Sequence, residues 1–402
     1  MAHPPLTAST TLIRYILERR LAGETLTASD GYALIAAKGD DLTAVLSAAK
    51  RLNDDARPNK RITYSRKLFI PLTNLCRDRC GYCTFVHAPN EPGAHTMTPD
   101  EVLDVARKGA DLGCKEALFS LGDHPEWQYS QMKDTLKNLG YNSTPEYVAA
   151  MCKLVLEETG ILPHTNCGLL DRDELESVSA YNVSMGLMLE NVSPRLQERG
   201  GPHFGVVSKA PELRIEMLSL AGQMGVAMTT GILIGIGERL DERVDSLLAI
   251  RDVQERYGNI QEIIIQNFRA KPDTRMRRAH EPATEDMLQT LATARLLMGS
   301  EMNIQAPPNL NEDYASYLQT GMNDWGGVSP LTADFINPEA SWPQLVTLRE
   351  NTAKAGYELH ERLALYPEYV TSDKWPLPEP IALRVGELAG PDGYVKGELE
   401  QW

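Results

Sequence analysis

Short apolar runs alternate with helix-like stretches between residues 65 and 357 of this 402-residue chain. This alternation is typical of βα units that build a parallel sheet. There are eight such runs, at 67–72, 116–121, 161–165, 183–189, 227–234, 262–266, 303–306 and 324–328. Eight βα units are enough to close a barrel, so we predict an α/β fold, a (β/α)8 barrel of the TIM type.

The segments on either side of these repeats have a different character. Residues 1–62 contain two helix-like stretches, 10–21 and 40–52, and then a polar linker. We predict that they form a helical extension and that 63–365 form the barrel. Residues 366–402 are rich in proline, which favours an irregular tail that wraps the barrel.

The composition favours an enzyme that acts on a small molecule. The formal net charge is −15, whereas binding to nucleic acid or to an anionic membrane normally needs a basic surface. Residues 1–20 lack the features of a secretory signal, so we expect a cytoplasmic location. The longest apolar runs are far shorter than a membrane span.

Three cysteines, Cys76, Cys80 and Cys83, follow the first predicted strand directly in a C-x3-C-x2-C pattern. The carboxyl ends of barrel strands carry the active site, so this loop is expected on the functional face. A 4Fe-4S cluster that only carries electrons usually has one cysteine for each of its four irons. Three cysteines would leave one iron open, and an open metal position is where a ligand can bind.

Two other interpretations of the triplet remain open. One is a structural zinc site with His87 as the fourth ligand, and the other is a set of redox thiols. The remaining cysteines, Cys114, Cys152 and Cys167, are widely spaced, which favours burial in the core.

With Tyr82 just before the last cysteine, the loop resembles the signature of radical S-adenosylmethionine (SAM) enzymes. The resemblance implies a 4Fe-4S cluster held by the three cysteines and a SAM molecule chelated to the open iron. It also implies an external electron donor, because reductive cleavage of SAM gives a 5′-deoxyadenosyl radical.

The same resemblance implies which residues contact SAM. Besides Tyr82, it assigns Gly122 and Asp123 to the amino group, Glu190 to the ribose, Arg214 to the carboxylate, and Gly235, in a glycine-spaced strand, to the adenine. Some of these positions also have an ordinary interpretation: a βα turn for Gly122 and Asp123, a solvated acid for Glu190, and a surface arginine for Arg214.

Several longer strings resemble the FO synthase family, in the domain that closes the deazaflavin ring. They lie at 71–80, 117–123, 229–231, 266–272 and 323–327. The resemblance implies a substrate made by a partner radical SAM enzyme, the tyrosine–uracil adduct 5-amino-5-(4-hydroxybenzyl)-6-(ribitylimino)dihydrouracil. Radical cyclisation of this adduct with loss of ammonia would form FO. The family usually has proline where Cys167 stands here.

Neutral polar groups at predicted strand ends could bind this substrate, and Gln266, Asn267 and Asp324 are the candidates. Within the class, the alternatives are the enzyme that joins tyrosine to the uracil and an enzyme of menaquinone synthesis. The alternative from another class is a non-catalytic iron–sulfur or zinc protein, which would consume no SAM.

Overall fold

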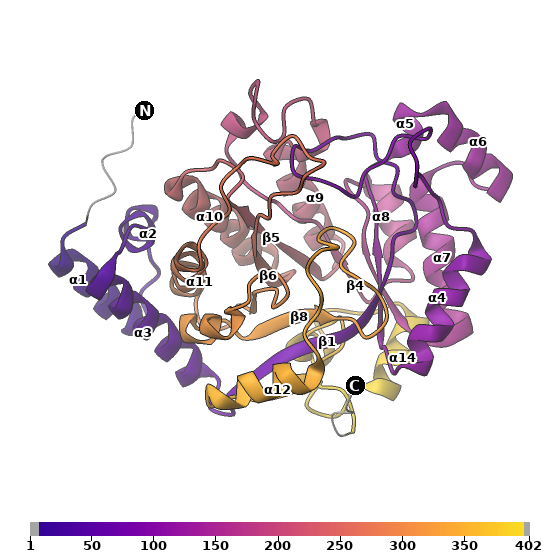
Figure 1. The fold of residues 1–402 in the computed structure, drawn as a ribbon. Helices are drawn as coiled ribbons and strands as arrows, with labels where there is room; N and C mark the ends of the chain where they lie inside the picture. Colours follow the sequence, from indigo (N-terminus) through magenta and orange to yellow (C-terminus); the bar gives the residue numbers. More distant parts are fainter. Residues whose placement is uncertain (1–7, 398–402) are drawn as a thin grey trace.

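A computed structural model describes residues 8–397 and confirms the predicted barrel. Strands β1 to β8 pair in parallel with their neighbours, and β8 pairs with β1 to close the ring (Figure 1). The strands are β1 Arg61–Ile70, β2 Glu116–Ser120, β3 Leu162–Asn166, β4 Ser184–Gly186, β5 Met228–Ile234, β6 Ile260–Asn267, β7 Ile304–Gln305 and β8 Asp324–Val328.

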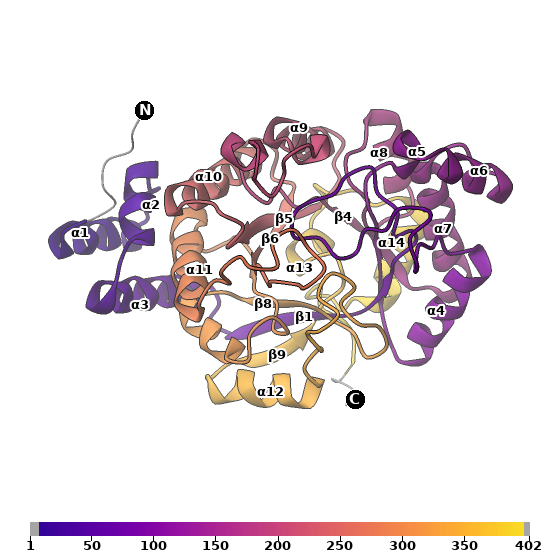
Figure 2. The same ribbon diagram turned by 45° about the horizontal axis from the view of Figure 1, so that its top comes forward.

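Helices surround the strands on the outside (Figure 2). Local sequence explains where several of them begin: Thr98 and Glu101 form a capping box at the start of α4, and Asp171 and Glu174 form another at α8. The α-helices between β1 and residue 357 are α4 Pro99–Asp111, α5 Pro125–Gln128, α6 Ser130–Leu139, α7 Thr144–Thr159, α8 Arg172–Ser179, α9 Pro211–Gln223, α10 Leu240–Tyr257, α11 Thr284–Met298 and α12 Leu345–Lys354. Short 3-10 helices lie at η1 Pro194–Gln197, η2 Val207–Lys209 and η3 Tyr314–Thr320.

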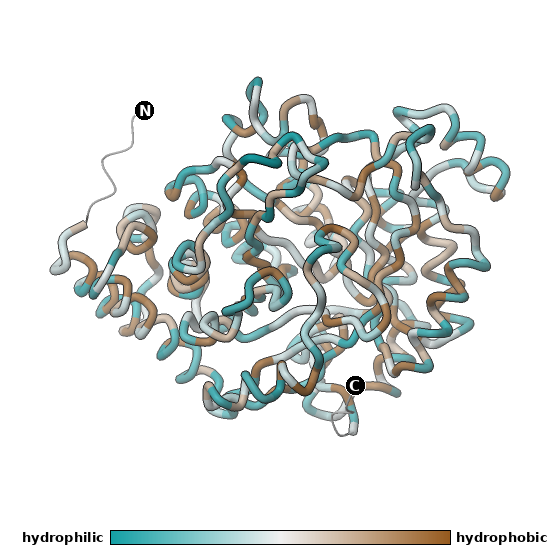
Figure 3. Tube along the Cα trace, viewed as in Figure 1, coloured by the Kyte–Doolittle hydropathy of each residue, from teal (hydrophilic) through white to brown (hydrophobic). Residues whose placement is uncertain are grey.

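The N-terminal extension consists of three helices, α1 Thr10–Leu21, α2 Ala28–Ile35 and α3 Gly39–Ala56. The middle one was not predicted. It begins with a capping box between Thr27 and Asp30, and Gly31 lies so close to α10 that a Cβ there would be 2.7 Å from Val244. The three helices lie at one side of the barrel, and their apolar faces join its hydrophobic core (Figures 1 and 3).

The C-terminal part adds a ninth strand, β9 Glu358–Glu361, that pairs with the first half of β1. The second half of β1 pairs with β2, so both neighbours share one edge of β1. The predicted tail is more regular than expected, because it holds α13 Pro367–Val370 and α14 Glu379–Leu388. Trp375 packs on Tyr369, while Trp402 lies outside the described residues.

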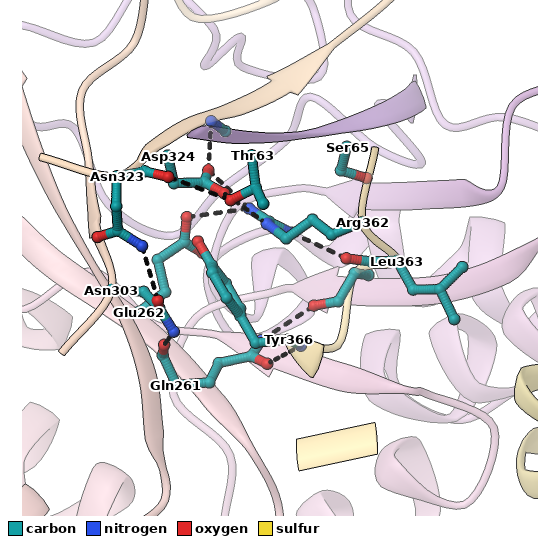
Figure 4. Close-up of polar contacts among 12 residues, drawn as sticks. Thr63, Ser65, Gln261, Glu262, Asn303, Asn323, Asp324, Arg362, Leu363 and Tyr366 are labelled. Atoms are coloured by element: carbon teal, nitrogen blue, oxygen red, sulfur yellow. Dashed lines mark hydrogen bonds and ion pairs between the residues drawn. The ribbon is translucent and has the colours of Figure 1, made fainter. Parts of the chain in front are cut away.

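The segment after β9 closes the amino-terminal end of the barrel with a buried ion network (Figure 4). The Arg362 Nε atom lies 2.6 Å from Asp324 Oδ2, and its Nη2 atom lies 2.9 Å from Asp324 Oδ1 and 3.3 Å from Glu262 Oε1. The hydroxyl of Thr63 also donates to Asp324. All four residues are buried, so this end of the barrel is a closed floor.

None of the helices in the described part of the chain is long and apolar enough to cross a membrane.

Candidate active site

The three cysteines of the triplet line one cavity of about 230 Å3 at the carboxyl ends of the barrel strands. Loops that follow other strands hold this cysteine loop in place. The amide of Gly81 donates to the Pro202 carbonyl at 2.7 Å, and the amide of Met276 donates to the Gly81 carbonyl at 3.1 Å. The position of the triplet therefore depends on loops after β4 and β6.

The surroundings of Cys76 suit a metal-bound thiolate. Its Sγ accepts hydrogen bonds from the backbone amides of Asp123 at 3.1 Å and Asp78 at 3.3 Å. Burial nevertheless raises the pKa of the Cys76 thiol to about 12, so the thiolate needs a positive partner such as iron. A four-iron cluster fits this loop, because each thiolate binds a separate iron.

A single metal ion would need its ligands to converge more closely. Within residues 8–397, no group of three or more His, Cys, Asp or Glu side chains is arranged to hold one ion. Cys114, Cys152 and Cys167 are buried and do not line this cavity, and neither does His87. The cavity thus brings together three thiols from the described residues.

Gly122 allows the turn after β2 to approach the cysteine loop. A Cβ at this position would lie 2.6 Å from Cys76 Sγ and 2.9 Å from the Leu75 carbonyl oxygen. The turn therefore requires glycine because of this close approach.

We expect a Gly122→Ala variant to fold but to hold less than about a tenth of the wild-type iron, because the added methyl displaces Cys76. Iron and sulfide per chain after anaerobic reconstitution measure this effect. Gly386→Ala is the matched control, since a Cβ at Gly386, within α14, meets no atom within 4 Å. Equal iron contents in the two variants would contradict the steric argument.

The carboxylate of Asp123 is occupied by the protein itself. Its Oδ1 lies 2.6 Å from Arg77 Nε and 3.0 Å from His124 Nδ1, while Oδ2 accepts from the Leu169 amide at 2.8 Å. Burial would raise the pKa of Asp123, but the hydrogen bonds from His124 and Leu169 lower it below its ordinary value. Asp123 is therefore ionised, and its contacts join the cysteine loop to the segments around it.

His124 lies between two carboxylates, those of Asp123 and Glu174. Its Nδ1 faces Asp123, its Nε2 lies 3.1 Å from Glu174 Oε1, and its ring stacks on Trp127. Burial lowers the pKa of His124, but the two acidic partners outweigh this effect and raise it to about 9 from an ordinary 6.5.

The raised pKa predicts a specific dependence of stability on pH. The imidazolium stabilises the fold fully below about pH 6.5, and its contribution is lost as the pH rises through about 9. We expect the loss to be about 3 kcal/mol at most, since one pKa unit corresponds to about 1.4 kcal/mol. Denaturant unfolding of wild type and His124→Gln between pH 6 and 10 checks this, and parallel curves would refute it.

Glu190 and Arg214 also line the cavity. Glu190 follows β4 with a backbone φ of 65°, held by hydrogen bonds to Gly231 and Leu233 of β5. Its Oε1 atom pairs with Lys209 Nζ at 2.6 Å. Arg214 donates to the carbonyls of Ser208 at 2.8 Å and Met188 at 2.5 Å, which leaves other guanidinium donors for a ligand.

Tyr82 also lines the cavity, with its hydroxyl 3.1 Å from His203 Nε2.

Gly235 does not line the cavity. It lies in the turn after β5 rather than within the strand, so the expected glycine-spaced strand includes only Gly231. At Gly235 the backbone φ is 91°, and a Cβ would overlap Pro282. Glycine is therefore needed at this position by the conformation of the turn.

Of the three expected substrate contacts, Gln266 and Asn267 line the cavity and Asp324 does not. Asn267 Nδ2 donates to the Leu310 carbonyl, while its buried Oδ1 has no partner among the described atoms. Asp324 lies at the amino end of β8, in the buried floor. We therefore replace its expected role in substrate binding with a structural one.

Sequence reasoning missed several polar residues of the cavity wall, among them Lys209, Lys271 and Asn337. Lys271 Nζ donates to Asn337 Oδ1 at 2.7 Å, which joins the loop after β6 to the loop after β8. Lys271 lies within the 266–272 string, a signal that could have identified it. Lys209 ends the short 3-10 helix η2 and Asn337 lies in an irregular segment, and neither segment carries a comparable signal.

Comparison with known proteins places the chain in a family. It is 46% identical over 389 residues to an FO synthase of Streptomyces avermitilis, covering 94% of this chain and 45% of that protein. It is 47% identical over 310 residues to a 7,8-didemethyl-8-hydroxy-5-deazariboflavin synthase of Methanopyrus kandleri, covering 77% of this chain and 92% of that protein. This chain belongs to the FO synthase family.

Residues 70–250 of this FO synthase family member also match the radical SAM superfamily. Its fold is similar to that of the FeFe-hydrogenase maturase HydG from Carboxydothermus hydrogenoformans, with a TM-score of 0.71 and 17% identity over 93% of this chain and 88% of that one. The chain spans less than half of the Streptomyces relative.

Proposed function

We propose that this chain catalyses the radical ring closure that forms the deazaflavin FO from the tyrosine–uracil adduct 5-amino-5-(4-hydroxybenzyl)-6-(ribitylimino)dihydrouracil, with loss of ammonia. The observation that carries the proposal is the convergence of Cys76, Cys80 and Cys83 on a cavity with Glu190 and Arg214 in its wall. The Methanopyrus kandleri relative, named for the deazaflavin product and covered over 92% of its length, supports this choice of reaction.

In this proposal the three cysteines each bind one iron of a 4Fe-4S cluster, and SAM occupies the adjoining cavity. When bound, these groups supply the electron and the organic radical that start the reaction. Arg214 pairs with the SAM carboxylate, and Glu190 accepts hydrogen bonds from the ribose hydroxyls. Backbone groups of Ser120 and Gly122 receive the amino group, because the Asp123 carboxylate is already occupied.

The adduct is supplied by a partner radical SAM enzyme, and a reducing protein or small molecule supplies the electron. A cytoplasmic location stays a prediction, supported by the oxygen sensitivity of such clusters. The assignment of 1–62, 63–365 and 366–402 as separate parts also stays a prediction.

The test is anaerobic reconstitution with iron and sulfide, followed by incubation with dithionite, SAM and the adduct. Formation of 5′-deoxyadenosine together with deazaflavin fluorescence is the expected result. Deoxyadenosine without the fluorescent product would assign another substrate, such as that of the tyrosine–uracil joining enzyme or of a menaquinone pathway enzyme. Neither product from a reconstituted protein would favour a non-catalytic iron–sulfur or zinc protein.

A further inference from the structure

A second chamber of about 170 Å3 lies inside the barrel, next to the cavity that the three cysteines line; that first space is called the cofactor cavity below. The two spaces share lining residues, namely Ser120, Asn166, Met188, Gln266 and Ile336. Alternate residues of the strands, such as Lys67 and Phe69 of β1, point into this chamber and are only partly buried. The barrel is therefore hollow at this level, whereas packed side chains usually fill such a barrel.

Three glycines on two strands, β4 and β8, make room for polar side chains from neighbouring strands. A Cβ at Gly327 would overlap Lys67, and a Cβ at Gly326 would overlap the amide of Gln305. A Cβ at Gly186 would lie 3.1 Å from His164 Nε2. Lys67, Gln305 and His164 all line the chamber, so the glycine positions leave space for polar groups there.

The hydrogen bonds of His164 fix its protonation state. The hydroxyl of Ser184 donates its one proton to the Ala364 carbonyl at 3.0 Å, so it must accept from His164 Nδ1 at 2.8 Å. Nδ1 therefore carries the proton, and Nε2, beside Gly186, is an acceptor with no partner among residues 8–397. Burial lowers the pKa of His164 to about 4, so the ring is neutral at pH 7.

Most charged groups around the chamber are ion-paired, and the carboxylate of Asp334 accepts hydrogen bonds from the side-chain amides of Asn309 and Asn337. Lys67 Nζ lies 2.8 Å from Glu116 Oε1, and Arg362 pairs with Glu262 and Asp324. The side-chain amides of Gln266 and Gln305 have no hydrogen-bond partner among the described residues, like Nε2 of His164. The unused hydrogen-bonding capacity thus belongs mainly to neutral groups, which suit a neutral polar ligand.

We propose that this chamber binds the uracil ring of the substrate, with His164 Nε2 as the acceptor for the ring N3–H. The Lys67 ammonium, which has donors left beyond Glu116, and the Gln305 amide donate to the ring carbonyls. This inference rests on the proposed function and identifies the residues that select a cyclic ureide. A buried acceptor that the ligand must satisfy discriminates strongly against a ligand that lacks the matching N–H.

The test compares two probes, ribityl-aminouracil and its N3-methyl derivative, by anaerobic equilibrium binding to the reconstituted protein. We expect the wild type to bind the N3–H probe at least tenfold more tightly. His164→Phe removes the acceptor and retains a ring of similar size, so its preference should fall to less than twofold. Equal binding of both probes by the wild type would overturn the proposal, and so would full preference in His164→Phe.

His280→Phe, at an exposed position, is the matched control and should keep the wild-type preference. If His164→Phe does not fold, Gly186→Ala replaces it, because its methyl would crowd Nε2, and it too should lose the preference. An unchanged preference in Gly186→Ala would count against the proposal. A wild type that forms FO but does not distinguish the probes would refute only this inference, whereas a wild type that distinguishes them without forming FO would refute only the proposed reaction.

Discussion

Cys80→Ala protein should retain its fold, hold no intact 4Fe-4S cluster and form product at least about 1,000-fold more slowly than wild type. Cys80 is one of the three thiols that line the cavity, and the remaining two leave a second iron without a protein ligand. Cys80 is half-buried in a loop rather than packed in the barrel core, so its removal should cost little stability. Iron and sulfide content, visible absorbance and the rate of 5′-deoxyadenosine formation measure the loss.

Cys114→Ala is the matched control for this prediction. Cys114 is buried in the turn before β2 and does not line the cavity, so this variant should keep the cluster and most of its activity. A Cys80→Ala protein with the same cluster content and turnover as Cys114→Ala would remove the cysteine triplet from the mechanism.

Arg362→Met should destabilise the protein by about 3–5 kcal/mol, the usual cost of removing one partner from a buried ion pair. The guanidinium is 3% exposed and pairs with Asp324, which is fully buried, and with Glu262. Without it, the Asp324 carboxylate would have no ionic partner in the floor of the barrel. The free energy of unfolding from denaturant titration measures the effect.

Arg107→Met is the matched control. It removes an exposed ion pair with Glu158, so the free energy of unfolding should fall by no more than about 1 kcal/mol. Asp324→Ala should also lower the free energy of unfolding. This loss is expected if Asp324 has a structural role, and it is not expected if Asp324 only binds substrate. Replacing both partners, as Arg362→Met with Asp324→Asn, should recover part of the loss because no unpaired charge then remains. Equal stability of Arg362→Met and Arg107→Met would show that the floor network contributes little.

The sequence predicted the barrel well because its eight strands are apolar runs between helical stretches. It did not predict β9, since three of the residues 358–361 are polar and only Leu359 is apolar. It also did not predict α2, a helix of eight residues whose stability depends on packing against α10 and α11. Short elements of this kind are specified by tertiary contacts more than by local propensity.

In the candidate site, too, some residues could be placed from the sequence and others could not. Residues that follow a strand, such as Cys76, Gly122 and Glu190, could be placed because the carboxyl ends of parallel strands meet at one face. Asp324 was misplaced because it starts its strand and so lies at the opposite end of the barrel. The inward direction of His164 could not be predicted, since a shift of one residue along a strand reverses its facing.

The closed floor also constrains how the chain reaches its native state during synthesis. Thr63 of β1 meets Asp324 across 261 positions, and Arg362 meets that aspartate from a further 38 positions along the chain. Such distant contacts form late, because the intervening loop must be ordered first. The contacts of the first barrel strand in the floor therefore cannot be completed before residue 362 has left the ribosome. A chain that ended before residue 362 would expose an unfinished barrel to aggregation and proteolysis.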